Sequence, residues 1–347
     1  MITYHGAQWT NLNPALLVIL CAGLFILPFF PLSATAGELA EKSEKSTLIR
    51  RIKFAEIIIA LIVILGFSLH NIFILIGALF LLGVQASFFG PVKYSILPQH
   101  LAPKDIVAGN GMVEMGTFIA ILLGTILGGL LISNEKMGVI YVSSTVLFLA
   151  LLGFFLSLLI PKAPATEPEL KVNWNIVTAT YNSLKLINLN GHVYVALIGI
   201  SWFWFYGALF LSQFSLFCKF LGGNEFVVTV FLTMFSIGAG IGAVLCEKLS
   251  KGKIELALVT IGGIGLTVFA LDVFLASPSQ ASAQLVGFKE FFSGFQNLRI
   301  SIDLLLMGIS SGFFTVPLYA DLQMTVPENY RSRIIGANNI LNTIFMV

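Results

Sequence analysis

The sequence predicts an all-α protein embedded in a membrane. Hydrophobic residues make up 57% of the 347-residue chain and charged residues only 10%, whereas a typical soluble domain is about a quarter charged. The apolar residues form long runs of about 20 residues, the length at which an α-helix crosses the roughly 30 Å hydrocarbon core of a bilayer. The chain also holds 31 Phe residues, which suit lipid-facing and helix-packing surfaces.

Nine of these runs are long enough to cross a bilayer, and a tenth begins near residue 333 and is cut off at Val347. A polar stretch separates the first five runs from the rest. The chain therefore divides into an N-terminal helix bundle (1–160), a linker (161–190) and a C-terminal helix bundle (191–347). The nine complete runs lie at about 14–36, 52–69, 72–98, 106–132, 138–160, 191–218, 226–246, 254–276 and 298–321.

The linker combines a segment that excludes a helix with one that favours an amphipathic helix. Prolines interrupt its first part, where each removes a backbone hydrogen-bond donor. After them, apolar residues recur at roughly helical spacing, which predicts a helix lying on the inner leaflet. The prolines are Pro161, Pro164 and Pro168, and the apolar residues are Trp174, Val177, Tyr181, Leu184 and Ile187.

The distribution of Lys and Arg fixes the predicted orientation, because inner loops of membrane proteins carry an excess of these residues. With the loop at 37–53 placed inside, fourteen of the 19 basic residues fall on the inner side and Lys93 alone lies within a span. The remaining four are on the outer side: Lys136, Lys219, Lys289 and Arg299.

Charge and cysteine usage exclude several other classes of protein. A net charge of +2 gives no electrostatic reason to expect a nucleic-acid partner. Cys21, Cys218 and Cys246 all lie in apolar runs without metal-ligand spacing, so neither a metal site nor a disulfide framework is predicted.

Short motifs recur in the same order in the two halves. Residues 39–45 (LAEKSEK) match 245–251 (LCEKLSK), and 92–97 (VKYSIL) match 317–322 (PLYADL). A further pair follows at Asn110–Gly111 and Asn338–Asn339. This order predicts two parallel repeats related by an axis along the membrane normal, an arrangement found in transporters.

The segment GELAEKSEK, which begins at Gly37, resembles the inner-loop signature of the major facilitator superfamily, Gly-x-Leu-Ala-Asp-Arg-x-Gly-Arg-Arg. Glu44 stands in place of the second glycine and Ser46 in place of the last basic residue. Residues 88–114 are similar to the lysophospholipid transporter branch of that superfamily, in which Gly-Pro-x-Lys-Tyr-x-Ile-Leu-Pro and a downstream Asn-Gly-x-x-Glu recur. The residues that match these two motifs are Gly90, Pro91, Lys93, Tyr94, Ile96, Leu97, Pro98, Asn110, Gly111 and Glu114.

The resemblance implies a major-facilitator two-bundle fold that is truncated, with the family's first and last helices missing. It also implies a transporter that moves lysophospholipids across the bacterial inner membrane by alternating access. In several bacteria such a transporter is fused ahead of an acyltransferase and an acyl-carrier-protein synthetase. A fused or adjacent enzyme of this kind, coupled to re-acylation of the lipid, is therefore the expected partner besides the lipid substrate and the bilayer.

Two alternatives remain open at the level of sequence: a generic major-facilitator carrier of drugs or sugars, and an inactive truncated gene product. An enzyme is not expected. His100 and Asp105 fit the His-x4-Asp spacing of acyltransferases, but they lie in a short loop between two spans, and so short a motif often matches by chance. No catalytic residue, cofactor or metal is predicted.

Lys93 and Glu114 are the predicted centre of a binding cavity. A lysine within the membrane costs roughly 3 kcal/mol on insertion scales, so it needs water or a counter-charge. The two residues flank the same loop at similar sequence distances, which predicts similar depth and an ion pair. Asn110 lies one turn from Glu114 and is its predicted hydrogen-bond partner, and Tyr94 and Gln85 complete the predicted cavity.

A site with one cation and one carboxylate would complement the phosphate and ammonium groups of a zwitterionic lysolipid. In the alternative interpretation, the lysine reaches the inner headgroups with its long side chain, and the glutamate only locks two helices together.

Charged residues at the inner helix ends predict a gate. Ion pairs between the halves, together with helix dipoles, would hold the inner side shut; in the alternative interpretation these charges only set topology. The predicted gate residues are Glu41, Lys42, Lys45, Glu247, Lys248 and Lys251. Further along the chain, Asp303 is predicted to pair with Arg299, four residues earlier on the same helix face.

Two Gly-x-x-x-Gly pairs, at Gly124 and Gly128 and at Gly238 and Gly242, predict close approach between helices, because glycine lets two backbones come together.

Overall fold

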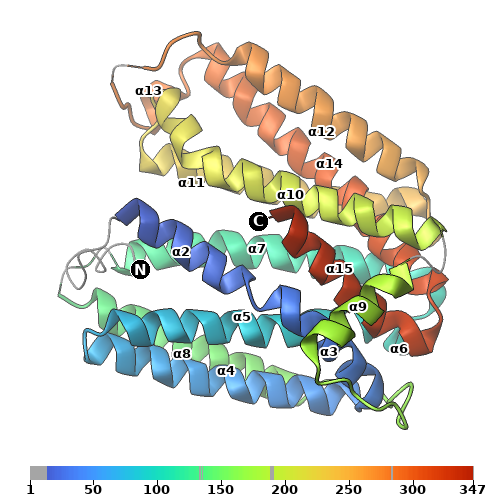
Figure 1. The fold of residues 1–347 in the computed structure, drawn as a ribbon. Coiled ribbons are helices and arrows are strands. Elements are labelled where there is room, and N and C mark those ends of the chain that lie inside the picture. The colour runs from blue at the N-terminus through green and yellow to red at the C-terminus, as the bar shows by residue number, and fades with distance from the viewer. Residues whose placement is uncertain (1–13, 133, 135, 188–190, 283, 347) are drawn as a thin grey trace.

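The computed structural model describes the whole chain except residues 1–13, 133, 135, 188–190, 283 and 347. Two bundles of long helices lie side by side, and the linker crosses from one to the other at the inner side (Figure 1). In this part of the chain, eight helices are long and apolar enough to cross a membrane. The predicted all-α membrane architecture is therefore confirmed.

Within the described residues, the N-terminal bundle contains five long helical segments that run in alternating directions. The first is made of two helices, α2 and α3, and the third continues into the short helix α6. The bounds are α2 Pro14–Ile26, α3 Phe29–Lys42, α4 Lys45–Ser68, α5 Ile72–Ser95, α6 Leu97–His100, the 3-10 turn η1 Pro103–Asp105, α7 Ile106–Ile132 and α8 Gly138–Ser157.

The linker and the C-terminal bundle follow in the predicted order. The bounds are α9 Ile176–Leu186 in the linker, then α10 Gly191–Phe220, α11 Glu225–Ser250, α12 Ala257–Ala276, α13 Phe288–Phe291, α14 Phe295–Thr325, the 3-10 turn η3 Glu328–Tyr330 and α15 Arg331–Met346. α4 is not among the eight apolar spans, although it is 24 residues long. Its inner half carries the charged residues Arg50, Arg51, Lys53 and Glu56.

Side chains at the inner and outer loops define where several helices begin. Glu44 accepts hydrogen bonds from the backbone N–H groups of Ser46 (3.0 Å) and Thr47 (2.8 Å) at the start of α4. Asn71 does the same for α5, with the N–H of Phe73 at 2.9 Å. These caps satisfy donors that have no partner within the helix. They explain why α4 begins several residues before the apolar run at 52–69.

Helix α9 lies within the predicted segment, but three of the five predicted apolar residues face outward, whereas Leu184 and Ile187 pack inward. Trp174 just before it and Val177 and Tyr181 within it are exposed, whereas Thr180 and Ser183 are buried. The helix packs on α3 and α15 with its small and polar side. Contact between the exposed side and the inner leaflet stays a prediction.

The two bundles meet chiefly at four pairs of helices: α3 with α15, α7 with α11, α5 with α15 and α7 with α14. Gly37 allows the first contact, because a Cβ atom there would lie 2.7 Å from the backbone oxygen of Ser332. Within the C-terminal bundle, Gly238 and Gly242 touch the backbone of α14, as predicted. The same prediction is wrong for Gly124, where a Cβ atom would meet none of the described residues within 4 Å.

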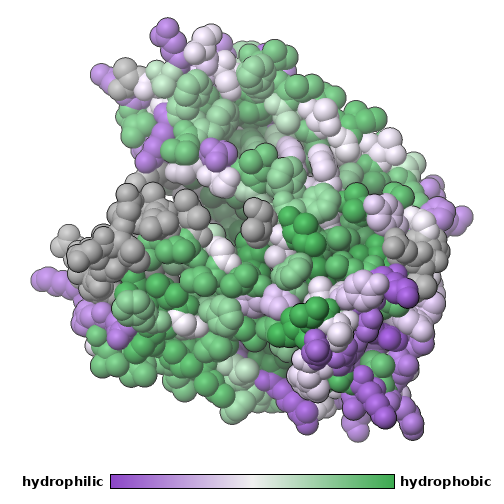
Figure 2. Space-filling view, in the orientation of Figure 1, coloured by the Kyte–Doolittle hydropathy of each residue, from purple (hydrophilic) through white to green (hydrophobic). Residues whose placement is uncertain are grey.

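The contacts between the bundles are concentrated toward the inner ends of the helices. α7 and α11 still touch at Phe118 and Phe235, whose ring centroids are 5.9 Å apart. Further out the two bundles diverge, and the space-filling view is hollowed on that side (Figure 2). The molecule is thus closed at the inner end and open at the outer end.

Candidate functional site

Two tyrosines from matching repeat positions meet where the bundles join. Tyr94 on α5 and Tyr319 on α14 stack with ring centroids 4.4 Å apart and an interplanar angle of 3°. Both are almost fully buried. Each lies shortly after a proline inside its helix, Pro91 and Pro317. The internal repeat paired these two tyrosines, and the fold brings the pair face to face.

Glu114 is held by Tyr94 and not by Lys93. The Tyr94 hydroxyl donates to Glu114 Oε1 at 2.6 Å, whereas Glu114 Oε2 is buried and has no hydrogen-bond partner among the described residues. Lys93 is half-buried, and its Nζ lies 4.5 Å from the centroid of the Tyr94 ring. The predicted direct ion pair is therefore wrong: within the described residues, no salt bridge within 4 Å joins Lys93 to Glu114.

Lys93 and Glu114 form no direct ion pair because the side chain of Tyr94 contacts both of them. The hydroxyl of Tyr94 is a strong donor for the carboxylate, and the face of its ring attracts the ammonium group. Tyr94 thus lies between two groups of opposite charge. The sequence pattern placed all three residues in one site but did not give Tyr94 this central position.

Asn110 joins the two bundles instead of contacting Glu114. Its side-chain amide donates to Gln323 Oε1 at 2.8 Å and accepts from Gln323 Nε2 at 2.9 Å. Both side chains are fully buried, so this reciprocal pair satisfies polar groups that water cannot reach. The predicted hydrogen bond from Asn110 to Glu114 is wrong.

Gln323, Tyr319 and Trp204 were not among the predicted site residues. Trp204 Nε1 donates to the Tyr319 hydroxyl at 3.1 Å, which extends the cluster into α10. Gln323 lies just past the segment that matches residues 92–97. A polar residue so close to a repeat motif was the signal that could have identified it.

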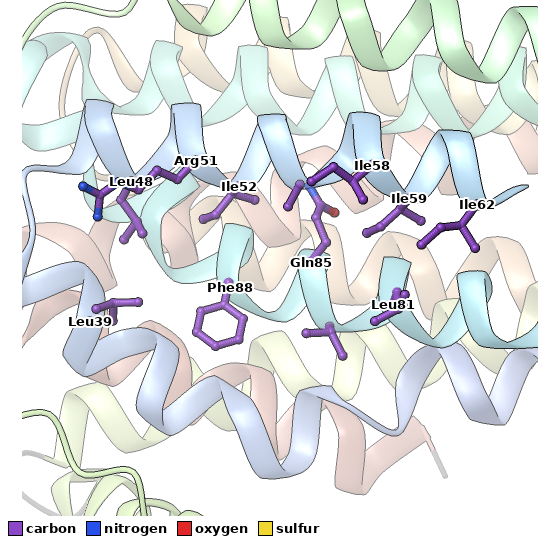
Figure 3. A pocket seen from close by; sticks show the side chains of 12 residues that line it. Leu39, Leu48, Arg51, Ile52, Ile58, Ile59, Ile62, Leu81, Gln85 and Phe88 are labelled. Atoms are coloured by element: carbon purple, nitrogen blue, oxygen red, sulfur yellow. The ribbon is translucent and has the colours of Figure 1, made fainter.

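Gln85 belongs to a different part of the molecule from Tyr94. Its amide donates to Glu56 at 3.0 Å, and Glu56 also pairs with Lys53 at 2.8 Å. It lines a groove formed with α3 and α4 (Figure 3). The prediction that Gln85 lines the cavity of Lys93 is wrong, because its side of α5 packs against α4.

At the inner end, Glu41 links the bundles. It is fully buried, and its carboxylate accepts from the backbone N–H of Ser332 at 2.5 Å and from the Thr166 hydroxyl. Arg333 of α15 pairs with Glu167 of the linker at 2.7 Å. These contacts hold the start of α15 against α3 and the linker.

The other predicted gate residues make no ion pair between the halves in the described part of the chain. Lys45 is buried, and no described residue forms a hydrogen bond with its Nζ. The remaining four are exposed: Lys42, Glu247, Lys248 and Lys251. The matching segment of the C-terminal half, residues 245–251, therefore does not repeat the contacts that Glu41 makes. Glu41 contacts the start of α15 and not this segment.

The predicted pair of Asp303 and Arg299 is also wrong. Arg299 binds Asp272 on the neighbouring helix α12, with Nε 2.9 Å from the carboxylate. Arg299 and Asp272 are both partly exposed, whereas Asp303 is buried. Packing α12 beside α14 offers Arg299 an acceptor from another helix, which spacing along one helix cannot reveal.

Comparisons with known proteins agree with this geometry. The family model described as Major Facilitator Superfamily matches residues 3–347. The chain belongs to the major facilitator superfamily. It is a multi-pass membrane transporter of that family and not an enzyme.

Among its relatives, the chain is 26% identical to the "Lysophospholipid transporter LplT" of Serratia proteamaculans (strain 568) over 307 residues, which cover 86% of this chain and 69% of that protein. It is 24% identical to the protein of the same name from Cronobacter sakazakii (strain ATCC BAA-894) over 338 residues, covering 96% and 75%. The motif at residues 88–114 had indicated this branch of the superfamily.

Solved structures confirm the fold at much lower identity. The proton:xylose symporter XylE has a TM-score of 0.70 at 10% identity, covering 97% of this chain and 78% of that one. The transporter FucP in its outward conformation has a TM-score of 0.67 at 16% identity, covering 98% and 83%.

Proposed function

We propose that this chain moves lysophospholipids across the bacterial inner membrane by alternating access. Membership of the superfamily supports transport, and relatives named as lysophospholipid transporters support the class of substrate. The hollow at the outer end and the closed inner end correspond to one of the two states that alternating access requires.

The observation that carries the proposal is the unpaired oxygen of Glu114 beside Lys93. A buried carboxylate oxygen without a partner costs free energy that a ligand can recover. The ammonium of a lysophosphatidylethanolamine head would bind Glu114 Oε2, and its phosphate would bind Lys93 Nζ. Tyr94 keeps these two charges apart, as a zwitterionic head requires.

Closure of the outer end around a bound head would then release the inner contacts. The links that must break are the buried pair of Asn110 with Gln323 and the hydrogen bond from Ser332 to Glu41. Both join one bundle to the other, so rotation of the bundles strains them together. We assign Glu41 the role of an inner gate on this basis.

Delivery to the inner side would place the lysophospholipid where an acyltransferase can re-acylate it. An adjacent or fused acyltransferase and acyl-carrier-protein synthetase is the partner that the family resemblance implies. The chemistry fits, because re-acylation consumes the transported lipid and keeps its concentration low on the receiving side.

The test is transport in proteoliposomes that contain the purified protein. Radiolabelled lysophosphatidylethanolamine is added outside, and the fraction that albumin no longer extracts measures movement across the bilayer. We expect Lys93→Ala to abolish this movement, Lys93→Arg to retain part of it, and the exposed control Lys219→Ala to match the parent protein.

Unchanged transport by Lys93→Ala would overturn the assigned site. If the parent protein moves no lysophospholipid but takes up a neutral sugar, the proposed substrate class is wrong and the protein is a sugar carrier.

A further inference from the structure

A groove runs along the lipid-facing side of the N-terminal bundle, between α4, α5 and the end of α3 (Figure 3). Its volume is about 410 Å³. Ile52, Ile59 and Ile62 of α4 face Leu81 and Phe88 of α5 across it. Except for Arg51 and Gln85, all of its lining residues are apolar.

The groove is separate from the cluster around Tyr94. None of the residues that line it belongs to that cluster, and Gln85, which does line it, is turned toward Glu56 on α4. Whatever occupies the groove therefore does not compete with a ligand between Lys93 and Glu114.

A cation without a partner marks the inner end of the groove. Arg51 is exposed and, in the described part of the chain, makes no ion pair within 4 Å. The neighbouring basic residues already have partners. Arg50 Nη2 donates to the carbonyl of Ile160 at 3.1 Å, and Lys53 pairs with Glu56. The guanidinium of Arg51 extends toward Leu48, at the inner end of the groove (Figure 3).

A second cation lies near the same end. Lys42 follows the lining residue Leu39 by three positions on α3, about one helical turn, and it is exposed. Within the described residues it likewise makes no ion pair within 4 Å. Two cations at the inner end of an apolar groove favour an anionic headgroup at the depth of the inner leaflet.

The length of the groove fits one acyl chain. The lining residues of α4 run from Leu48 to Ile62, which is about 21 Å at a rise of 1.5 Å per residue. Half of the hydrocarbon core is roughly 15 Å, so a chain that starts at the inner headgroups stays within the groove down to mid-membrane.

We propose that this groove binds an anionic phospholipid of the inner leaflet, with one acyl chain between α4 and α5 and the phosphate on Arg51 and Lys42. The occupant is a bilayer lipid and not the transported substrate, because the lining residues Ile58 and Leu81 are exposed on the outside of the bundle. The proposal does not depend on the function proposed for the central site.

The experiment counts lipids that stay bound to the purified protein. Protein is reconstituted into nanodiscs of equal parts palmitoyl-oleoyl phosphatidylglycerol and phosphatidylethanolamine, extracted in mild detergent, and examined by native mass spectrometry. We expect one phosphatidylglycerol to survive extraction on the parent protein. Ala55→Trp, which fills the groove, should remove it, and Arg51→Gln should reduce its occupancy at least threefold.

Matched controls separate the groove from general lipid binding. Leu61→Trp places the same ring on the exposed lipid-facing side of α4, and Lys253→Gln removes an exposed cation of the inner side. Both should retain the lipid at the parent level. Equal retention by Ala55→Trp and the parent, or equal loss in the two tryptophan variants, would overturn the proposal.

Discussion

At the scale of single residues, Tyr94 determines how the charges of Lys93 and Glu114 are arranged. Its hydroxyl is the only hydrogen-bond donor to the Glu114 carboxylate among the described residues. Its ring lies between Lys93 and Tyr319. Removing the hydroxyl leaves the carboxylate without any donor in the protein, while the stacking of the rings is kept.

We therefore expect Tyr94→Phe to destabilise the protein by about 1–3 kcal/mol, the cost of leaving a buried polar group unsatisfied. Thermal unfolding in detergent measures the loss. Tyr141→Phe, at an exposed tyrosine, is the control and should change little. In a double variant with Glu114→Gln the two effects should not add; additive effects would show that Tyr94 and Glu114 act independently.

Glu44 supports a prediction about pH at the inner loop. Burial alone would raise the pKa of Glu44, but hydrogen bonds from Thr47, Ala163 and Ser46 lower it from 4.5 to about 2. Because the pKa is lowered in the folded state, the charged form contributes stability above pH 4.5, and this contribution is lost as the pH falls toward 2.

We expect Glu44→Gln to lower the stability at pH 7 by about 1 kcal/mol or less, since the group is partly exposed to water. The difference from the parent should shrink between pH 4.5 and pH 2. Thermal unfolding over this range is the measurement, with Glu169→Gln as a control at an exposed carboxylate. A difference that does not depend on pH would contradict the assignment.

At the scale of elements, the contact of α3 with α15 closes the inner end. Gly37 and Gly336 both lie in it, and a side chain at either position would run into the backbone of the other helix. The atoms that a new side chain would meet belong to the backbone, which cannot move aside as the end of a flexible side chain can. The two helices can only move apart.

We therefore expect Gly37→Val to expose Ser332, which is fully buried in the closed state. Ser332→Cys, in a background without the native cysteines, should react at least about tenfold faster with an impermeant maleimide in inside-out vesicles when Gly37→Val is present. Gly77→Val is the matched control, because a Cβ atom there meets nothing within 4 Å. Equal rates in all three proteins would show that this contact does not seal the inner end.

The elements themselves were largely predictable from sequence. Runs of apolar residues gave helix positions to within a few residues, and the run at 106–132 coincides with α7. The exceptions have local causes: the first crossing is split near Pro28 and continues to Lys42, and the cap at Glu44 starts α4 early. Hydropathy cannot detect either cause.

The proximity of Lys93, Tyr94 and Glu114 was predictable from the sequence, but the pairing of these residues and the position of Gln85 were not. Their role in binding a substrate stays a prediction. The predicted pairing rested only on the similar membrane depth of Lys93 and Glu114. Depth does not show which helix faces contact each other. The partners that decided the outcome, Tyr319 and Gln323, come from α14 in the other bundle. Only the assembled fold brings them into contact.

At the scale of the whole molecule, the two bundles touch near the inner side and separate toward the outside (Figure 2). On α7, a Cβ atom added at Gly116, Gly124 or Gly129 would meet nothing within 4 Å in the part of the chain that the structure describes. Near the inner end of the same helix, Asn110 is fully buried against Gln323. One helix therefore takes part in both the open end and the closed end.

This difference along α7 predicts opposite responses at the two ends when substrate binds. Hydrogen–deuterium exchange of the protein in nanodiscs should slow in peptides from the outer half of α7 on addition of lysophosphatidylethanolamine. It should become faster in peptides that cover η3 and the first turns of α15, because contacts such as the one from Glu41 to Ser332 are released as the outer end closes. Lys93→Ala should remove both responses, since the ligand loses its cation. Slowing at both ends would instead mean that the lipid only stiffens the protein, and alternating access would have to be abandoned for this chain.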